Sequence, residues 1–531
     1  MADRPVVSMA VSNPIALVVN GTAVEVPDDG AFLLETLRDR LGLKAAKDGC
    51  SPQGQCGCCT VLIDGQPRVA CVTPTTRVRG RSITTLEGLA GADKWAEALC
   101  ATGGSQCGFC TPGIIVRLAS RPADPKQALL AHLCRCTGWQ TILEAVELVA
   151  AEEVAAEGRP GAARRTEIEG HRPHAAEDRP GAAPRAEIEG HRPQVVNAAV
   201  ALGGGGFADD TAPDDALVAV RASDGSWAVG ETLTAARHLA GKIQGRRTTV
   251  AIRWPIDLPE GLHWHRTLQT TWVEPGYLEP DASWCRPGGE PVTPLANGGA
   301  FGAKTSSEIG AIARQLADEH GAPVKAVFSR EDVVRFGPKR PPMAAGVRSD
   351  GTGLIRVART PGIAAKIHAV APLLTVEEVD IAGPPTSAAL RAAGWAEAAI
   401  LLSSLGDVDT VTSPEGAIAT ATIAEDGSVH ITVQAGEVLD QVVLRSYCIG
   451  AAHQALGWVR SEAIAVDADG VPHDLTIRSF GILRAVDMPL VNVTITPGAG
   501  PAVNGSDAVF AAVAAAAWRQ SAWAPRWPCQ R

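Results

Sequence analysis

The sequence lacks the features that mark three common classes of protein. Its formal net charge of −10 at pH 7 comes without the basic stripe that binds nucleic acid. No apolar run approaches the roughly 20 residues that a membrane-spanning helix needs, and no secretory signal precedes residue 15. An odd number of cysteines is also untypical of a disulfide-bonded secreted protein. We therefore predict a cytoplasmic protein with no nucleic-acid partner and no membrane span.

Cysteine, by contrast, occurs in a pattern that predicts chemistry. Eight of the thirteen cysteines fall into two sets of four. The sets are Cys50, Cys56, Cys59 and Cys71 in GCSPQGQCGCCTVLIDGQPRVAC, and Cys107, Cys110, Cys134 and Cys136 in QCGFCTPG and LCRCTG. In the first set, two closely spaced thiolates, a third nearby and a fourth after a hairpin form the plant-type pattern of [2Fe–2S] ligands. We predict two [2Fe–2S] clusters, and hence a protein that transfers electrons.

The residues around each set predict a small domain. Asn-Gly at 20–21 and Asp-Gly at 64–65 lie between β-rich runs, as in tight hairpins. FLLETLRDRLG has the apolar spacing of a short amphipathic helix, which completes a β-grasp-like domain. Around the second set, TPGIIVRLAS, DPKQALLAHL and TGWQTILEAVELVA show helical spacing, with Pro112 and Pro125 near helix starts. Two helix pairs would present CGFC and CRC to one cluster.

The cysteine pattern leaves alternatives open. Five residues separate Cys50 from Cys56, one more than the plant-type spacing has, so Cys58 competes with Cys56 as a ligand. Paired Cys-x2-Cys also binds zinc tetrahedrally, although Cys-x-Cys is an uncommon zinc spacing. The cysteines without partners in a motif are interpreted as buried or incidental thiols; they are Cys100, Cys285, Cys448 and Cys529.

An internal duplication separates the cysteine-rich part from the remainder. RPGAARRTEIEGHRP at 159–173 recurs as RPGAAPRAEIEGHRP at 179–193. Its charges, prolines and small residues cannot build a core, so we predict a disordered linker over 154–194 that is open to proteases. His171 and His191 recur with the repeat, and metal binding by them is the alternative to a solvated spacer. The linker indicates a fusion of two parts.

Residues 12–150 resemble the iron–sulfur part of the molybdenum hydroxylases, the xanthine dehydrogenase and aldehyde oxidase family. QCGFCTPG and CRCTG after a ferredoxin-like domain carry this resemblance. It implies that the helical cluster lies beside a molybdopterin cofactor and that Gln106 contacts the pterin. Electrons would pass from molybdenum through the second cysteine set to the first.

Residues 197–531 resemble the molybdopterin-binding subunit of the same family in abbreviated form. In ANGGAFGAKTSSEIGAIARQLADEHGAPVKAVFSREDVVRFGPKRPP the glycines would let backbone N–H groups approach an anionic oxo ligand, ahead of a helix from about Ser306. The resemblance assigns cofactor contacts to Gly299, Phe301 and Gly302 in this segment. A glycine cluster before a helix is otherwise often only a turn.

Two further segments match the family's molybdopterin site. AALRAAGWAEAAILL at 388–402 places Arg391 in the position of a cofactor-contacting arginine, with a plain helix cap as the alternative. Gln441 stands where the family has a glutamine that contacts the cofactor, although Asp440 and Val442 replace the flanking glycines.

A departure from the family occurs near the C-terminus, where its catalytic Gly-Glu pair is expected. Here the sequence reads Gly505–Ser506, followed by Asp507. An unassisted serine has no comparable basicity near neutral pH, so the catalytic residue stays unassigned. Asp507 is the alternative candidate for the base, but Ser506 or Asp507 is predicted instead to act as the N-cap of the helix AVFAAVAAAAW.

These observations predict an α+β multidomain protein. The expected parts are a β-grasp ferredoxin-like domain (1–88), a four-helix [2Fe–2S] domain (89–153), the linker (154–194) and α/β molybdopterin-binding-like domains (195–370 and 371–531). The predicted function is oxidation of an aldehyde or N-heterocycle with water, the electrons leaving through both clusters. The alternative is an electron-transfer or scaffold subunit with a non-catalytic molybdopterin domain.

The partners follow from the same resemblance. No FAD-binding region is visible, so a separate FAD-binding or other electron-acceptor subunit is expected besides a small-molecule substrate. The sequence leaves open whether the chain forms a homo-oligomer, and it does not identify the substrate.

Overall fold

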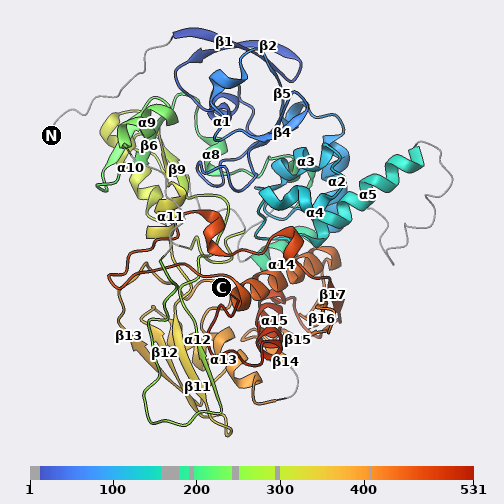
Figure 1. Ribbon diagram of the computed structural model, residues 1–531, viewed down its shortest axis with the longest axis vertical. Coiled ribbons are helices and arrows are strands. Elements are labelled where there is room, and N and C mark those ends of the chain that lie inside the picture. Colours follow the sequence, from blue (N-terminus) through green and yellow to red (C-terminus); the bar gives the residue numbers. More distant parts are fainter. Residues whose placement is uncertain are drawn as a thin grey trace.

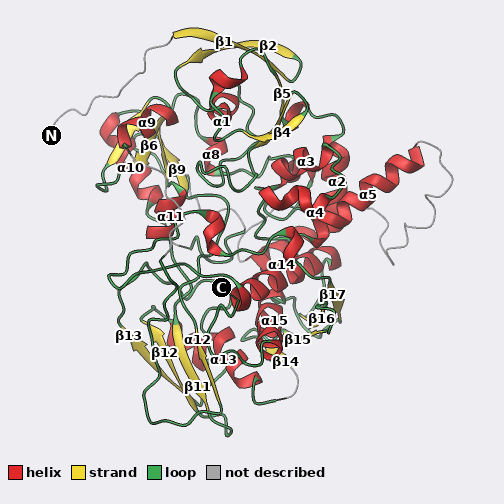
Figure 2. Cartoon of the chain, viewed as in Figure 1, coloured by secondary structure: helices red, strands yellow, loops and turns green. Residues whose placement is uncertain are grey.

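A computed structural model describes residues 12–156, 179–190, 196–241, 250–292, 299–305, 307–406 and 409–530. In these residues the strands form four sheets, and the helices lie between and beside them (Figures 1 and 2). The N-terminal sheet and the first long helices occupy one end of the molecule, and two of the C-terminal sheets occupy the other (Figure 1). No helix in the described ranges is long and apolar enough to cross a membrane.

The first domain is a mixed five-stranded sheet in the order β2-β1-β5-β3-β4. Its strands are β1 (Ser12–Val19), β2 (Thr22–Asp28), β3 (Thr60–Ile63), β4 (Gln66–Val69) and β5 (Ser82–Thr84). Both predicted hairpins form, because Asn-Gly at 20–21 and Asp-Gly at 64–65 adopt the positive φ values that a tight antiparallel turn requires. The predicted amphipathic helix is α1 (Leu33–Glu35), continued by a π-helical turn over Thr36–Arg40.

The second domain is helical, as the apolar spacing predicts. Its helices are α2 (Ala92–Thr102), α3 (Thr111–Ala119), α4 (Pro125–Ala128) and α5 (Gln140–Ala156). Proline occupies the first turn of α3 and of α4, where its missing N–H leaves no helical hydrogen bond unmade. The side chain of Asp124 caps α4 by accepting a hydrogen bond from the N–H of Gln127 at 3.1 Å.

The remaining chain forms three four-stranded sheets with helices on them. The strands are β6 (Leu217–Arg221), β7 (Trp227–Gly230), β8 (Arg266–Gln269), β9 (Ala282–Cys285), β10 (Val324–Val327), β11 (Met343–Val347), β12 (Gly353–Ala358), β13 (Leu374–Val379), β14 (Asp409–Thr412), β15 (Ile418–Ile423), β16 (Val429–Gln434) and β17 (Val491–Ile495). The sheet orders are β7-β6-β10-β9, β13-β12-β11-β8 and β14-β15-β16-β17. The helices are α7 (Ala198–Ala201), α8 (Ala208–Thr211), α9 (Leu233–Ala240), α10 (Ile309–His320), α11 (Arg330–Phe336), α12 (Ile363–His368), α13 (Trp395–Ser403), α14 (Gln441–Arg460) and α15 (Ser506–Gln520).

The predicted domain boundary at residue 370 needs correction. β13 pairs in parallel with β12 over six residue pairs, from Gly353↔Leu374 to Ala358↔Val379. A boundary at 370 would divide this sheet, so the two strands belong to one unit. Pairing of two strands across an intervening helix depends on segments far apart in the chain, which local sequence patterns do not determine.

Helices α14 and α15 form the buried centre of the C-terminal half (Figure 1). The alanine run of α15 is buried on every side, as is most of α14. A helix that is apolar all round is stable only inside a protein. This pair therefore provides a rigid surface on which the segments described below converge.

The predicted linker is ordered in part, which corrects the expectation of disorder. Residues 182–190 of the second repeat form α6 (Ala182–Gly190), which packs on α14. The side chains of Arg185 and Glu189 are 0% exposed. Composition alone did not reveal this, because the residues bury an ion pair rather than a large apolar face. The first repeat, 159–173, lies outside the described residues, as do His171 and His191.

Acidification is expected to destabilise the protein through His453 on α14. Burial holds the pKa of His453 at about 4, below its ordinary value of 6.5. Because the unfolded chain binds this proton first, stability is present above pH 6.5 and falls between pH 6.5 and 4, by about 1.4 kcal/mol for each pH unit. Denaturant unfolding at a series of pH values measures this slope. In His453→Gln the unfolding free energy should fall less steeply between pH 6.5 and 4, because one proton fewer is taken up on unfolding. An unchanged slope would contradict the assignment.

Candidate iron–sulfur and molybdopterin sites

The first cysteine set converges in the loop that precedes β3. All of its side chains are buried and none forms a disulfide. The side chain of Cys50 interacts with those of Cys56 and Cys71, and the side chain of Cys59 interacts with that of Cys71. Backbone N–H groups of Gln53 and Gln55 also donate to the Cys50 sulfur at 3.2 and 3.4 Å, and the N–H of Cys71 donates to Cys59 at 3.4 Å. Such N–H···S bonds are a means by which proteins tune iron–sulfur clusters.

Cys58 lies at the inner side of the same loop. A Cβ atom added at Gly49 would lie 3.0 Å from the Cys56 sulfur, 3.1 Å from the Cys58 sulfur and 3.2 Å from the ring of Phe109. The Cys58 sulfur therefore lies between the first set and the CGFC segment of the second. The structure brings both sulfurs to the site, so Cys56 and Cys58 remain alternatives.

The second cysteine set converges from the two segments that lead into α3 and α5. The sulfurs of Cys107 and Cys136 are 3.6 Å apart, and the side chain of Cys110 interacts with that of Cys134. The hydroxyl of Thr137 lies 3.2 Å from the Cys134 sulfur. Two such pairs match the two irons of a [2Fe–2S] cluster, each of which takes two cysteine ligands.

Close backbone contact joins the two sets. A Cβ atom at Gly113 in α3 would lie 2.2 Å from the carbonyl oxygen of Gly57, so only glycine permits this approach. Gly57 in turn packs on His132, where a Cβ would lie 2.4 Å from the imidazole. Burial lowers the pKa of His132 to about 4, so the ring is neutral near pH 7. A neutral imidazole avoids a buried charge between the two candidate clusters.

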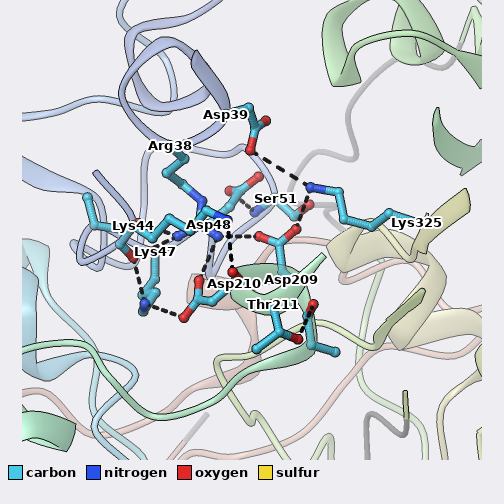
Figure 3. A network of polar contacts seen from close by, with 12 residues as sticks. Arg38, Asp39, Lys44, Lys47, Asp48, Ser51, Asp209, Asp210, Thr211 and Lys325 are labelled. Atoms are coloured by element: carbon cyan, nitrogen blue, oxygen red, sulfur yellow. Dashed lines mark hydrogen bonds and ion pairs between the residues drawn. The ribbon is translucent and has the colours of Figure 1, made fainter. Parts of the chain in front are cut away.

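A buried ionic network attaches the first domain to the C-terminal half (Figure 3). Arg38 donates to Asp209 and Asp210 at 2.7 Å each, and Lys325 pairs with Asp209 at 2.8 Å. Lys47 completes the network through Asp210. Burial opposes ionisation of Asp209, but Lys325 and Arg38 outweigh it and hold its pKa below the ordinary range. The network fixes the first cysteine set relative to the segments that follow the repeat.

The glycine-rich segment lies against the second cysteine set. A Cβ at Gly299 would be 3.1 Å from the Cys136 sulfur and 3.3 Å from the Cys107 sulfur. At Gly302, with φ +89°, a Cβ would be 1.8 Å from the carbonyl oxygen of Ala389. The structure thus brings this segment together with the loop of Arg391. Helix α10 follows it but begins at Ile309, three residues later than the predicted Ser306.

Arg391 connects the glycine-rich segment to the start of α15. Its N–H donates to the Phe301 carbonyl at 2.9 Å, and its guanidinium lies 3.7 Å from the Phe301 ring centre. The same guanidinium donates to Ser506 at 3.0 Å and pairs with Asp507 at 3.1 Å. Burial lowers the pKa of Arg391, and Asp507 opposes that shift. The side chain therefore contacts residues from two other segments, which a plain helix cap would not do.

The two predicted glutamines have different environments. Gln106 is buried, and its amide donates to the Cys136 carbonyl at 3.2 Å and to Ser446 at 2.9 Å. Its Oε1 atom is buried without a hydrogen-bond partner among the described residues, so a donor group is missing there. Gln441, in contrast, is exposed at the first position of α14. The structure places Gln441 apart from the buried group around Arg391.

The predicted cap of α15 needs correction. Ser506 is the first residue of the helix and is fully buried, and neither it nor Asp507 caps the helix. The side chain of Asn504 accepts a hydrogen bond from the Asp507 N–H at 2.9 Å instead. Glu189 of the repeat accepts the N–H groups of Gly505 and Ser506 at 3.0 and 2.8 Å. Sequence reasoning missed Glu189; the duplication itself was the signal, because it repeats an Arg-x3-Glu spacing that suits a helical ion pair.

The residues around Arg391 do not fit a molybdopterin in this conformation. The cavity beside Phe301, Arg391 and Gln454 has a volume of about 40 Å³, enough for a water molecule but far too small for a pterin. Arg391 is already paired with Asp507, and Glu189 covers the start of α15. The unpaired Oε1 of Gln106 is nevertheless a feature that a cofactor would satisfy.

The chain is similar to known iron–sulfur proteins over its N-terminal part. A family profile of the [2Fe–2S] binding domain matches residues 85–147. The caffeine dehydrogenase subunit gamma of Pseudomonas sp. (strain CBB1) is 37% identical over 155 residues, which cover 26% of this chain and 91% of that protein. The xanthine dehydrogenase iron–sulfur-binding subunit of Escherichia coli O157:H7 is 39% identical over 130 residues, 22% of this chain and 80% of that protein.

Longer relatives match over a small part of their length. The xanthine dehydrogenase of Drosophila pseudoobscura pseudoobscura is 39% identical over 157 residues, which are 25% of this chain but 12% of that protein. Among solved structures, the aldehyde oxidoreductase from Desulfovibrio gigas has a TM-score of 0.66 at 15% identity, and covers 95% of this chain and 97% of that chain. This likeness extends the shared fold beyond the cysteine-rich part. The chain belongs to the molybdenum hydroxylase family, with an iron–sulfur part fused to a part that has the fold of the molybdenum-binding half.

Proposed function

We propose that this chain is an electron-transfer subunit that carries two [2Fe–2S] clusters. The first cluster would be held by Cys50, Cys56, Cys59 and Cys71, and the second by Cys107, Cys110, Cys134 and Cys136. The observation that carries the proposal is the convergence of each set in one place, where every cysteine except the half-buried Cys107 is buried and two sulfurs are 3.6 Å apart. Among the described residues, no group of three or more His, Cys, Asp or Glu side chains is arranged to hold a single metal ion. A two-iron cluster needs only two cysteines at each iron.

The packing supports a direction for the electrons. The second set lies against Gly299. Gln53 and Gln55 beside the first set hydrogen-bond to the segment 475–478 but keep part of their surface exposed. Electrons would enter at the second cluster, cross the Gly57–Gly113 contact and leave at the first. The receiver would be a separate subunit or carrier that binds over the loop of Gln53.

The hydrogen bonds of Ser506 support a non-catalytic role for the C-terminal half. Ser506 replaces the glutamate expected from the family, and its hydroxyl accepts a hydrogen bond from Arg391. The same hydroxyl donates to the amide oxygen of Asn504 at 3.4 Å, and an amide oxygen is too weak a base to take its proton. A serine held in this way cannot serve as a general base. The small cavity beside Arg391 supports the same conclusion.

A second candidate is a molybdopterin-dependent oxidation of an aldehyde or N-heterocycle. The observation that favours it is the buried Oε1 of Gln106, which lacks a donor next to the second cysteine set. If bound, the cofactor would supply the redox centre that accepts two electrons from a substrate. Gln106 would contact its polar edge, and Gly299 would allow its close approach.

Metal and spectroscopic analysis tests the proposal. Anaerobically purified protein should hold about four irons per chain and show two distinct [2Fe–2S] EPR signals after reduction. Cys110→Ser should remove one signal and about half the iron, because a thiolate ligand of one cluster is lost. Cys100→Ser, a buried cysteine outside both sets, is the matched control and should keep both signals. Stoichiometric zinc without visible absorbance would refute the proposal, and molybdenum in the wild-type protein would favour the second candidate.

A further inference from the structure

Helix α6, from the second copy of the repeat, covers the N-terminal end of α15. The carboxylate of Glu189 on this helix accepts hydrogen bonds from the N–H groups of Gly505 and Ser506, at 3.0 and 2.8 Å. The first N–H groups of a helix have no partner within the helix and carry partial positive charge, so they attract an anion. Glu189 occupies this position as a ligand would.

Two buried arginines at the same place have hydrogen-bonding capacity left over. The Nη1 atom of Arg391 has no hydrogen-bond partner among the described residues, although Arg391 is only 4% exposed and contacts Ser506 through Nη2. Arg185 is 0% exposed and pairs with Glu189 at 2.8 Å. A buried guanidinium with unused N–H groups is unfavourable unless an anion compensates it. Arg185 belongs to α6 and would leave with it, and Arg391 is already paired with Asp507. What the start of α15 offers an anion is therefore its own N–H groups and the Nη1 group of Arg391, which no described residue uses.

Contacts at both ends hold α6 in place. Arg179 donates to Asp440 at 3.1 Å and to the Cys100 carbonyl at 3.0 Å. A Cβ at Gly181 would lie 2.2 Å from the carbonyl oxygen of Leu439, so the segment approaches α14 as closely as glycine allows. At the other end, Asn504 donates to the Ile188 carbonyl at 3.0 Å. The segment is thus seated by contacts with α14, α15 and the residues just before them.

We propose that α6 is an internal plug that occupies an oxyanion-binding site at the start of α15. The carboxylate of Glu189 stands in for an anionic ligand of the phosphate class, and such a ligand reaches Gly505, Ser506 and Arg391 only after α6 has left. This contact keeps an outside anion from the first N–H groups of α15, because Glu189 already uses them. It does not depend on the clusters, because every contact that carries it lies outside the two cysteine sets.

Three variants of the full chain test the plug. Glu189→Gln removes the charge that binds the end of α15. Ala186→Thr places a larger side chain at a 0% exposed position of α6 without altering any charge, and threonine is the residue at the matching position of the first repeat, Thr166. Glu187→Gln is the matched control, because Glu187 lies on the exposed face of the same helix.

The readouts are hydrogen exchange of residues 182–190 and trypsin cleavage after Arg185. Both should be slow in the wild type and in Glu187→Gln. We expect both to rise at least about tenfold in Glu189→Gln and in Ala186→Thr, because either change loosens the anchored helix. Circular dichroism and the exchange of α14 separate release of α6 from general unfolding, since α14 should stay protected in all four proteins.

Inorganic phosphate is the ligand probe. In Glu189→Gln, phosphate should slow hydrogen exchange at residues 504–507, and it should have no such effect in the wild type or in Glu187→Gln. Unchanged exchange of α6 in both releasing variants would overturn the proposal. So would phosphate protection of residues 504–507 in the wild type while α6 stays protected, or a released variant that does not respond to phosphate. Iron content plays no part in these readouts, so failure of the cluster assignment would leave them interpretable.

Discussion

Replacing Glu462 with glutamine is expected to lower the free energy of unfolding by about 3 to 5 kcal/mol, the usual effect of breaking a buried ion pair. Arg135 lies between two cysteines of the second set and donates through both Nη atoms to the Glu462 carboxylate at 2.6 Å each. Both side chains are buried. Burial raises the pKa of Glu462, and Arg135 opposes that shift. Glutamine would leave the arginine charged and unpaired, and denaturant unfolding of the purified protein measures the loss.

Two further variants test whether the loss of stability comes from the burial of this ion pair. Asp380→Asn breaks an ion pair with Arg359 that is more than half exposed on both sides, and should leave the stability almost unchanged because solvent screens the pair. Arg135→Met combined with Glu462→Leu removes both charges and should be more stable than Glu462→Gln alone. If Glu462→Gln were no more damaging than Asp380→Asn, the pair would not hold the second cysteine set to the C-terminal half.

Replacing Gly450 with alanine is the second change for which we expect a large effect. Gly450 lies within α14, and a Cβ there would be 1.7 Å from the carbonyl oxygen of Cys136. Neither the helix nor the CRC loop can yield without moving the second cysteine set, because the same carbonyl also accepts a hydrogen bond from Gln106. We expect a loss of about 3 kcal/mol, the upper end for overpacking. Thermal and denaturant unfolding measure it, and the EPR signal of the second cluster should change as well.

Another helical glycine provides the control for this substitution. At Gly310 in α10 the nearest atom to an added Cβ would be 3.6 Å away, an ordinary contact. Gly310→Ala should therefore stabilise the protein by about 0.5 to 1 kcal/mol, because alanine restricts the unfolded chain more than glycine does. Equal effects at Gly450 and Gly310 would show that helix propensity, and not the contact with Cys136, determines the result.

The predictions that succeeded depend on residues close together in the sequence, and those that failed depend on residues far apart in it. The turns at 20–21 and 64–65 depend on φ values that neighbouring residues determine, so the sequence was sufficient to predict them. The helices α3 and α5 were predicted from apolar spacing and from proline near a helix start. The domain boundary at 370 and the cap of α15 were wrong, because each depends on which distant segment supplies the partner.

The sequence by itself determined that the chain carries two sets of four cysteines at cluster-like spacing, and it indicated the family. Spacing along the chain is enough for this, since ligands from one loop or one helix pair stay close in any fold. The tertiary structure decided what surrounds those sets. Arg135 meets Glu462 across 327 positions, and Glu189 meets Ser506 across 317. Burial makes these charged contacts strong, and burial exists only once distant segments have packed together.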